Sequence, residues 1–260
     1  MSVAGLEICE LSKSFAQGRR QVPVVRDFAL SLREGEFVSL IGPSGCGKST
    51  VLSIVAGLAE ASAGEVRVLG RRVTRGGPDR GVVFQAPCLL PWLTARENVM
   101  LAVERVRPGA SRTIQEWHAE QYLAMVGLAS AGARRPAELS AGMRQRVALA
   151  RAFALGSRVL LLDEPFGMLD SITRAELQDL LLELCGREPR TTLMVTHDVD
   201  EALLLSDRVA MMSAGPAATI GGIVEVPLSR PRARAALEDP TYAALRAQLL
   251  DFVEAQPIPA

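Results

Sequence analysis

The sequence predicts an α/β fold with a mostly parallel sheet. Short apolar segments typical of buried strands, among them residues 158–162 and 191–195, alternate with segments in which apolar residues recur at helical spacing. A glycine-rich stretch at residues 42–50 stands between one such strand and one such helix. Because ligands of parallel sheets bind at the carboxyl ends of the strands, we expect the functional residues in the loops at that edge.

The predicted elements form three zones and a tail. The first zone has strand-like segments separated by glycine and charged turns, at residues 6–11, 27–32, 37–41 and 65–68. The second zone has helical periodicity at residues 94–106, 113–126 and 144–155. In the third, strands are predicted at 158–162, 191–195 and 208–212, and helices at 171–185 and 199–206. The tail has a predicted strand at 223–226 and a helix that begins at Asp239 and Pro240, with an apolar face formed by Leu245, Leu249, Phe252 and Val253.

The composition narrows the class of protein. Lys and Arg together number 29, as do Asp and Glu, so the chain has no net charge that would attract nucleic acid. Aromatic residues make up only 4%, which leaves few platforms for stacking bases. The four cysteines are scattered, which favours reduced thiols in a cytoplasmic setting over a zinc site or a disulfide framework. We expect no signal peptide, because the first ten residues have neither a basic n-region nor an apolar h-region. We expect no membrane span either, because the apolar runs are far shorter than the roughly 18–20 residues that cross a bilayer.

Residues 42–50 match the phosphate-binding pattern G-x-x-x-x-G-K-[ST] at every fixed position. The glycines allow successive backbone N–H groups to turn toward phosphate oxygens, Lys48 supplies a positive charge, and Ser49 offers a hydroxyl to Mg²⁺. The helix that follows adds its N-terminal dipole. A glycine-rich turn with an incidental lysine is the alternative, but the strand before and the helix after favour a nucleoside triphosphate site. Its residues are Gly42, Pro43, Ser44, Gly45, Cys46, Gly47, Lys48, Ser49 and Thr50.

Two adjacent carboxylates follow the apolar strand at residues 158–162. The strand delivers Asp163 to the ligand edge of the sheet, where it can hold the Mg²⁺ shell, and places Glu164 to orient or activate an attacking water. A strand followed by an acidic helix cap has the same local sequence. In a chain with a phosphate loop, the catalytic interpretation is favoured.

A third motif, Leu-Ser-Ala-Gly-Met-Arg-Gln at residues 139–145, opens an amphipathic helix. Ser140 lies near the start of this helix, whose N-terminus is a second place where an anion can bind. Alone, the motif would indicate only a helix cap. Because it lies between the phosphate loop and the two carboxylates, we interpret it as a specific functional motif rather than a generic helix cap.

In this order, the three motifs resemble those of the ATP-binding subunits of ABC transporters, over nearly the whole chain. The resemblance implies that Phe15 stacks on adenine, that Gln85 touches Mg²⁺ and the attacking water, and that His197 contacts the γ-phosphate. It also implies that residues 139–145 are the family signature and residues 166–170 the D-loop. The implied catalytic residues are Glu164, His197 and Gln85, the metal ligands are Ser49, Gln85 and Asp163, and the nucleotide ligands are the loop residues with Phe15, Ser140, Ala141 and Gly142.

The same resemblance implies a P-loop NTPase core with an N-terminal antiparallel β-subdomain and an inserted helical subdomain. Residues 1–88 would hold the first part of the core with the β-subdomain, 89–155 the helical subdomain, 156–214 the second part of the core, and 215–260 a C-terminal tail with a short helix. Two ATP-binding subunits, identical or paralogous, would enclose two ATP molecules head to tail. They would drive two membrane-spanning permease subunits at the cytoplasmic face of the inner membrane, and an extracytoplasmic solute-binding protein indirectly. No nucleic-acid partner is implied.

Three residues depart from the family pattern. Ala141 replaces the first glycine of the signature, and its methyl group is harmless at helical φ but costs about 1 kcal/mol or more at positive φ. Met143 stands where many members have glutamine, and Met168 where the D-loop usually has alanine. Because Ser140 and Gly142 are retained, we expect a working signature.

Residues outside the nucleotide site resemble a narrower group. Residues 77–80, 89–98 and Phe166 are similar to importers of nitrate, sulfonate and taurine. Residues 211–221, 225–227 and 230–232 more narrowly resemble the nitrate/nitrite branch with its cyanate and bicarbonate relatives. The resemblance therefore implies uptake of a small anion, with nitrate or nitrite first and the other four solutes as alternatives. The solute never touches this subunit, so physical reasoning on its residues does not identify the anion.

Two non-transport ATPases and a kinase are the remaining alternatives. A DNA-repair ATPase of this superfamily would need a long coiled-coil insertion between Lys48 and Leu139, but that interval is 139 − 48 = 91 residues and carries no heptads. A translation-associated ATPase would have two nucleotide cassettes and a basic charge balance. A kinase would leave the helix that begins near Ser140 unexplained.

Overall fold

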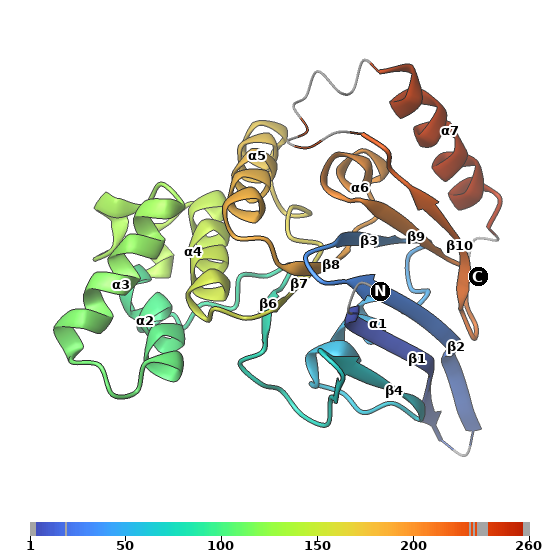
Figure 1. Cartoon of the computed structure of the whole chain (residues 1–260), viewed down its shortest axis with the longest axis horizontal. Coiled ribbons are helices and arrows are strands. Elements are labelled where there is room, and N and C mark those ends of the chain that lie inside the picture. The colour runs from blue at the N-terminus through green and yellow to red at the C-terminus, as the bar shows by residue number, and fades with distance from the viewer. Residues whose placement is uncertain (1–3, 19, 229, 231, 233–238, 257–260) are drawn as a thin grey trace. The chain divides into compact units, whose positions relative to one another are not determined.

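The computed structural model describes residues 4–18, 20–228, 230, 232 and 239–256 (Figure 1). Pro231, which belongs to the tail segment at residues 230–232, lies outside these residues, as do the first three residues of the chain. The chain divides into two compact units, one formed by Met1–Gly77 with Leu182–Ala260 and the other by Pro78–Leu181. No described helix combines the length and the apolar composition that crossing a bilayer requires.

The first unit contains an antiparallel sheet with strand order β2-β1-β4-β5. Its strands are β1 (Ala4–Gln17), β2 (Arg20–Arg33), β4 (Ala63–Val68) and β5 (Arg71–Arg72). The predicted strands at 6–11 and 27–32 are too short, because β1 and β2 pair along their whole length, from Ala4 opposite Arg33 to Gln17 opposite Arg20. The outer half of this hairpin, residues 11–17 and 20–26, mixes polar with apolar side chains and has only Leu11 and Val25 buried, so hydrophobic alternation does not reveal it.

The first unit also contains strands in the order β10-β9-β3-β8, of which β9, β3 and β8 are parallel. Strands β3 (Phe37–Ile41), β8 (Thr191–Val195) and β9 (Arg208–Met212) have the predicted bounds, and β10 (Ile220–Glu225) pairs antiparallel to β9. Every residue of β3 and β8 is buried, which explains why both are mainly apolar and contain no charged residue. Helices α1 (Lys48–Ala56) and α6 (Val199–Leu205) follow β3 and β8.

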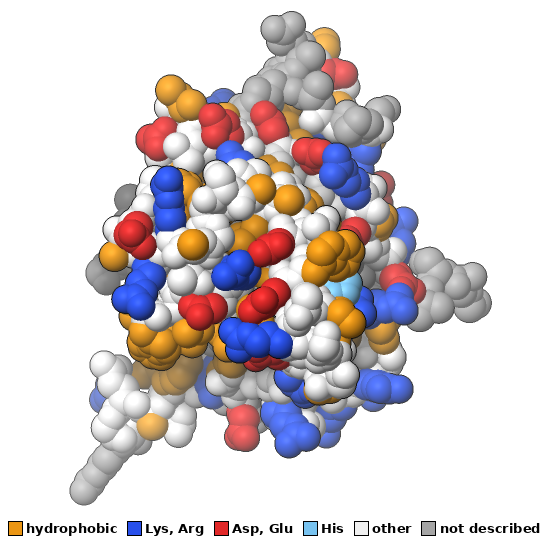
Figure 2. Space-filling model, turned by 90° about the vertical axis from the view of Figure 1, so that its left-hand side faces the viewer, with side chains coloured by type: hydrophobic (Ala, Val, Ile, Leu, Met, Phe, Trp, Pro, Cys, Tyr) orange, Lys and Arg blue, Asp and Glu red, His pale blue; other side chains and the backbone are white. Residues whose placement is uncertain are grey.

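The second unit pairs two parallel strands, β6 (Arg80–Val83) and β7 (Val159–Asp163), and adds helices. These are α2 (Ala95–Val106), α3 (Arg112–Met125) and α4 (Ala141–Ala154), which group together in Figure 1, and the start of α5 (Ser171–Arg187). Strand β6 escaped prediction because it is short and begins with an arginine, Arg80, whose side chain is buried. The face seen in Figure 2 mixes hydrophobic with charged side chains, and the exposed apolar residues of this unit include Trp92, Ile114 and Trp117.

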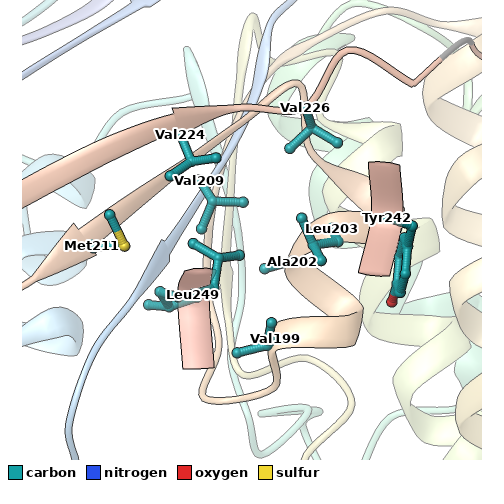
Figure 3. Packing of buried hydrophobic residues seen from close by; sticks show 10 residues of the cluster. Val199, Ala202, Leu203, Val209, Met211, Val224, Val226, Tyr242 and Leu249 are labelled. Carbon is teal, nitrogen blue, oxygen red and sulfur yellow. The ribbon is translucent and has the colours of Figure 1, made fainter. Parts of the chain in front are cut away.

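The predicted tail helix is α7 (Pro240–Glu254), and Asp239 caps it by accepting the N–H of Thr241 at 2.7 Å. Its predicted apolar face packs on a buried cluster with residues from α6, β9 and β10 (Figure 3). Tyr242 lies in this cluster and donates its hydroxyl to Asp200 Oδ1 at 2.7 Å. Arg246 Nε donates to the same oxygen at 2.8 Å. The tail helix is therefore joined to α6 by apolar packing and by one shared carboxylate.

We predict that Leu249→Ala destabilises the first unit. Leu249 is fully buried in the cluster, and removing a buried leucine side chain costs about 2–5 kcal/mol because the surrounding atoms relax only partly. Gln248→Ala, on the exposed face of the same helix, is the matched control and should change stability by less than about 0.5 kcal/mol. Guanidinium unfolding measures both variants. Equal midpoints for the two would contradict the packing described for α7.

Candidate functional site

The glycine-rich loop joins β3 to α1 in a conformation that requires glycine. Gly47 caps α1 with φ 108°, in the left-handed region, and provides no side-chain acceptor for the first N–H groups of the helix. A Cβ atom at this position would lie 2.9 Å from side-chain atoms of both Val24 and Val25. The start of α1 is therefore a helix N-terminus without a side-chain cap, which is a favourable place for an anion.

Lys48 is 6% exposed and is held by the loop itself. Its Nζ atom donates to the carbonyl oxygens of Gly42 at 2.8 Å and Pro43 at 2.9 Å. Cys46 lies buried beside it, with Sγ at 3.9 Å from Nζ, and burial raises the pKa of this thiol. The lysine is thus preorganised inside the loop, and the cysteine fills space as a neutral group.

His197 lies at the same edge of the sheet as this loop. Strands β3 and β8 are parallel neighbours, with Leu40 opposite Val195, so the segments that follow them start side by side. The N–H of Thr196 donates to the carbonyl of Leu40 at 3.2 Å. The imidazole of His197 is exposed just beyond this point.

A polar network that the sequence reasoning missed holds the chain on both sides of His197. Thr196 Oγ1 donates to Glu201 Oε2 at 2.7 Å and accepts the N–H of Asp198 at 3.0 Å. Asp198 caps α6 by accepting the N–H groups of residues 200 and 201. The Asp-x-x-Glu spacing at 198–201 is typical of a helix start and could have indicated the Asp198 cap, whereas the bond between Thr196 and Glu201 has no such local signal.

The second unit brings Gln85 and Glu164 together. Because β6 and β7 are parallel, with Val83 opposite Leu162, the residues after both strands share one edge. Gln85 Nε2 donates to Glu164 Oε2 at 3.1 Å. Glu164 has φ 44°, a left-handed conformation that a residue with a side chain rarely adopts. Such strained backbone is typical of functional positions, where the surrounding structure enforces it.

The signature residues form the start of α4. Ser140 is the N-cap, and its Oγ accepts the N–H of Met143 at 3.2 Å. Ala141 is the first helical residue and is not among the described non-glycine residues with positive φ, so its methyl group causes no backbone strain. Gly142 is constrained instead by packing, because a Cβ there would lie 2.3 Å from Thr173 Cγ2 in α5.

Phe15 is 48% exposed near the end of β1. The ammonium of Lys13 lies 4.9 Å from the centre of its ring and donates to the carbonyl of Glu60 at 2.7 Å. A cation over an aromatic face is a favourable contact. The side chain is accessible for stacking against a planar ligand, and Lys13 is a neighbour that sequence reasoning did not single out.

The proposed metal ligands have donor atoms suited to Mg²⁺. Ser49, Gln85 and Asp163 provide a hydroxyl, an amide oxygen and a carboxylate, which are hard oxygen ligands. Asp163 ends β7 and is half-buried. Among the described residues, no group of three or more His, Cys, Asp or Glu side chains could hold a metal ion. Mg²⁺ takes few protein ligands and completes its shell with phosphate oxygens and water.

We predict that Gly142→Ala lowers thermal stability, because its methyl group would overlap Thr173 and overpacking costs about 1–3 kcal/mol. Thr173→Ser removes the obstructing methyl group but keeps the hydroxyl. The double variant should therefore recover most of the lost stability, with Thr173→Ser alone as its control. A double variant as unstable as Gly142→Ala would show that this contact is not the constraint at position 142.

Known proteins of similar sequence are ATP-binding proteins of nitrate import and bicarbonate transport. The chain is 50% identical over 244 residues to the nitrate import ATP-binding protein NrtD of Synechococcus elongatus, covering 94% of this chain and 89% of the relative. It is 48% identical to the bicarbonate transport ATP-binding protein CmpD of Synechocystis sp., covering 97% and 90%. The chain is also 51% identical to the nitrate import ATP-binding protein NrtC of S. elongatus. This match covers 92% of this chain but only 36% of that longer relative.

Solved structures and a family model agree with this result. A dimeric ATP-binding cassette in a post-hydrolysis state, bound to ADP and Pi, has a TM-score of 0.76 at 31% identity and covers 86% of this chain and 100% of its own. A dimeric bacterial ABC transporter cassette has a TM-score of 0.77 at the same identity and coverage. The family model described as ABC transporter matches residues 25–167. The chain therefore belongs to the ABC transporter family, and it is a nucleotide-binding ATPase cassette of that family.

Proposed function

We propose that this ATPase powers the import of a small anion, and that the anion is nitrate or nitrite. The observation that carries this proposal is the 50% identity to a nitrate import ATP-binding protein over 94% of the chain. Bicarbonate is the second candidate, because the identity to a bicarbonate transport protein is nearly as high, at 48% over 97% of the chain.

In the proposed mechanism, the first unit binds the nucleotide. The N–H groups of residues 42–50 and the start of α1 hold the phosphates, and Lys48 exchanges its two carbonyl partners for phosphate oxygens. Phe15 stacks on adenine. His197 contacts the γ-phosphate from the neighbouring strand end, where Thr196 and Asp198 hold its backbone.

Residues of the second unit carry the hydrolytic step. Glu164 acts as general base toward the attacking water, and the Gln85 amide fixes the orientation of its carboxylate. Ser49, Gln85 and Asp163 would hold Mg²⁺, which supplies positive charge that neutralises the phosphates. The main chain of Glu164 is strained at φ 44°, so the direction of its carboxylate is set by the backbone as well as by Gln85.

The proposed assembly contains two ATP-binding subunits and two permease subunits at the cytoplasmic face of the inner membrane, with an extracytoplasmic solute-binding protein. Ser140, Ala141 and Gly142 would then contact the nucleotide of the other ATP-binding subunit through the N-terminus of α4. S. elongatus has two different relatives that are both described as nitrate import ATP-binding proteins, which supports a paralogue as the second subunit.

We propose the same functional segments as the sequence predicts, with boundaries after residues 88, 155 and 214.

We predict that Glu164→Gln retains ATP binding and loses turnover by roughly 10²–10⁴-fold, because the amide cannot accept the proton of the attacking water. ATP-bound dimers should accumulate in this variant. Lys48→Ala should instead weaken ATP binding, because it removes the charge at the phosphates. The two variants are distinguished by three measurements: nucleotide titration for ATP affinity, size-exclusion chromatography with ATP for dimers, and steady-state hydrolysis for turnover. Normal turnover in Glu164→Gln would remove Glu164 from the general-base role, and undiminished affinity in Lys48→Ala would contradict the phosphate-loop assignment.

We predict that deleting this chain in its host abolishes high-affinity uptake of labelled nitrate or nitrite, because the importer then lacks its source of energy. Labelled bicarbonate, cyanate and taurine are measured in parallel. Complementation with the wild-type chain should restore uptake, and complementation with Glu164→Gln should not. Loss of bicarbonate uptake with intact nitrate uptake would favour the second candidate.

A further inference from the structure

The segment between β6 and α2 contains Gln85, yet residues 84–94 belong to no described helix or strand. A segment without regular hydrogen bonding needs other contacts to keep a side chain in one place. In this segment the backbone carbonyl groups are bound by side chains of α4 and α2. The contacts from α4 lie on both sides of Gln85.

On the N-terminal side, Gln145 of α4 binds the residue that immediately precedes Gln85. Its Nε2 atom donates to the carbonyl oxygen of Phe84 at 3.2 Å. Gln145 is 2% exposed, so this bond is shielded from water. Gln85 and Gln145 also line the same small pocket, together with Pro87 and Leu169.

On the C-terminal side, Arg151 of α4 binds two successive carbonyl groups. Its Nη2 atom donates to Pro87 at 3.1 Å and its Nη1 atom to Cys88 at 3.0 Å. Burial of this side chain lowers the pKa of Arg151, yet arginine remains charged at neutral pH, and bonds from a charged donor are strong. Cys88 has φ 48°, so Arg151 binds the chain where its backbone is strained.

Helix α4 is itself fixed against β6. A Cβ atom at Gly81 would lie 3.2 Å from the carbonyl oxygen of Ala152, so the strand and the helix are in direct contact there. At the other end of the segment, the buried Asn98 of α2 accepts the N–H of Leu90 at 2.8 Å and donates to backbone carbonyls of Leu90, Leu93 and Thr94. The segment is therefore fixed at its far end independently of α4.

We infer that Gln145 and Arg151 are positioning residues. They hold the backbone on each side of Gln85 and thereby keep its amide in contact with Glu164 Oε2, at 3.1 Å. The inference rests on the proposed catalytic role of Gln85 and extends it to two residues outside the proposed catalytic and nucleotide-contacting set.

The test compares Arg151→Met with Arg146→Met in the full-length chain. Arg146 lies on the same helix and also donates to a backbone carbonyl, but to that of Val126, and its second contact is Glu176. The two variants thus lose similar side chains from one helix, and only Arg151 reaches the Gln85 segment. Arg151→Lys keeps one donor, and Gln145→Met removes the contact on the other side.

Two kinds of measurement are made. Amide hydrogen exchange is followed over residues 84–92, and steady-state ATP hydrolysis gives kcat and KM. In Arg151→Met, exchange in this segment should accelerate about tenfold or more while other segments keep their rates. The kcat value should fall by about ten- to hundredfold, because misplacement of a catalytic group by about 1 Å has effects of this size, and KM for ATP should stay within about twofold. Gln145→Met should act in the same direction, Arg151→Lys should be intermediate, and Arg146→Met should resemble the wild type.

Unchanged exchange over residues 84–92 in Arg151→Met would overturn the inference, whatever happens to kcat. Accelerated exchange with a normal kcat would overturn the positioning role, provided that Gln85→Ala lowers kcat. A Gln85→Ala variant with full activity would instead overturn the proposed catalytic role of Gln85. If Arg151→Met fails to fold, Arg151→Lys and Gln145→Met give the same comparison.

Discussion

Parallel pairing of buried strands is the constraint on which the functional loops depend. Strand β3 lies between β8 and β9 with all its residues buried, and β6 pairs with β7 in the same parallel sense. Parallel strands end at a common edge, so each pairing brings two loops together that are far apart in sequence. In the first unit the pairing joins the phosphate loop to His197. In the second it joins Gln85 to Glu164, 79 residues apart.

Within these loops, the backbone is held in conformations that would be unfavourable elsewhere. Gly47 adopts a left-handed conformation that only glycine accommodates between Val24 and Val25. Glu164 and Cys88 adopt positive φ although both have side chains. Contacts offset this strain, since Gln85 binds the carboxylate of Glu164 and Arg151 binds the carbonyl of Cys88. The loops are thus preorganised by side chains that belong to neighbouring elements, which is the condition for an electrostatic site that does not have to reorganise on binding.

The C-terminal tail contributes to the same preorganisation in the first unit. Helix α6 begins at Val199, two residues after His197, and α7 packs on it (Figure 3). Tyr242 and Arg246 of α7 both donate to Asp200. Arg232 is 4% exposed and donates to the carbonyl of Ser206, just after α6. Burial lowers the pKa of Arg232 to about 10, which leaves the group charged at neutral pH. The helix that follows His197 is therefore held by the tail as well as by its own capping residues.

The sequence by itself determined the features that depend on neighbouring residues in the chain. The glycine spacing at 42–50, the apolar segments at 37–41 and 191–195, and the Asp239 cap are all local patterns, and the structure has the corresponding elements. Only the tertiary structure decided the length of the β1–β2 hairpin, the existence of β6, and the partners of the polar side chains. It also showed that Gly142 is constrained by Thr173, whereas Ala141 occupies a helical position without strain. The physical reason is that helix caps and strand burial are set by residues a few positions apart, whereas the bonds of Gln85, Arg151 and Asp200 join residues more than 40 positions apart and exist only once the elements have packed.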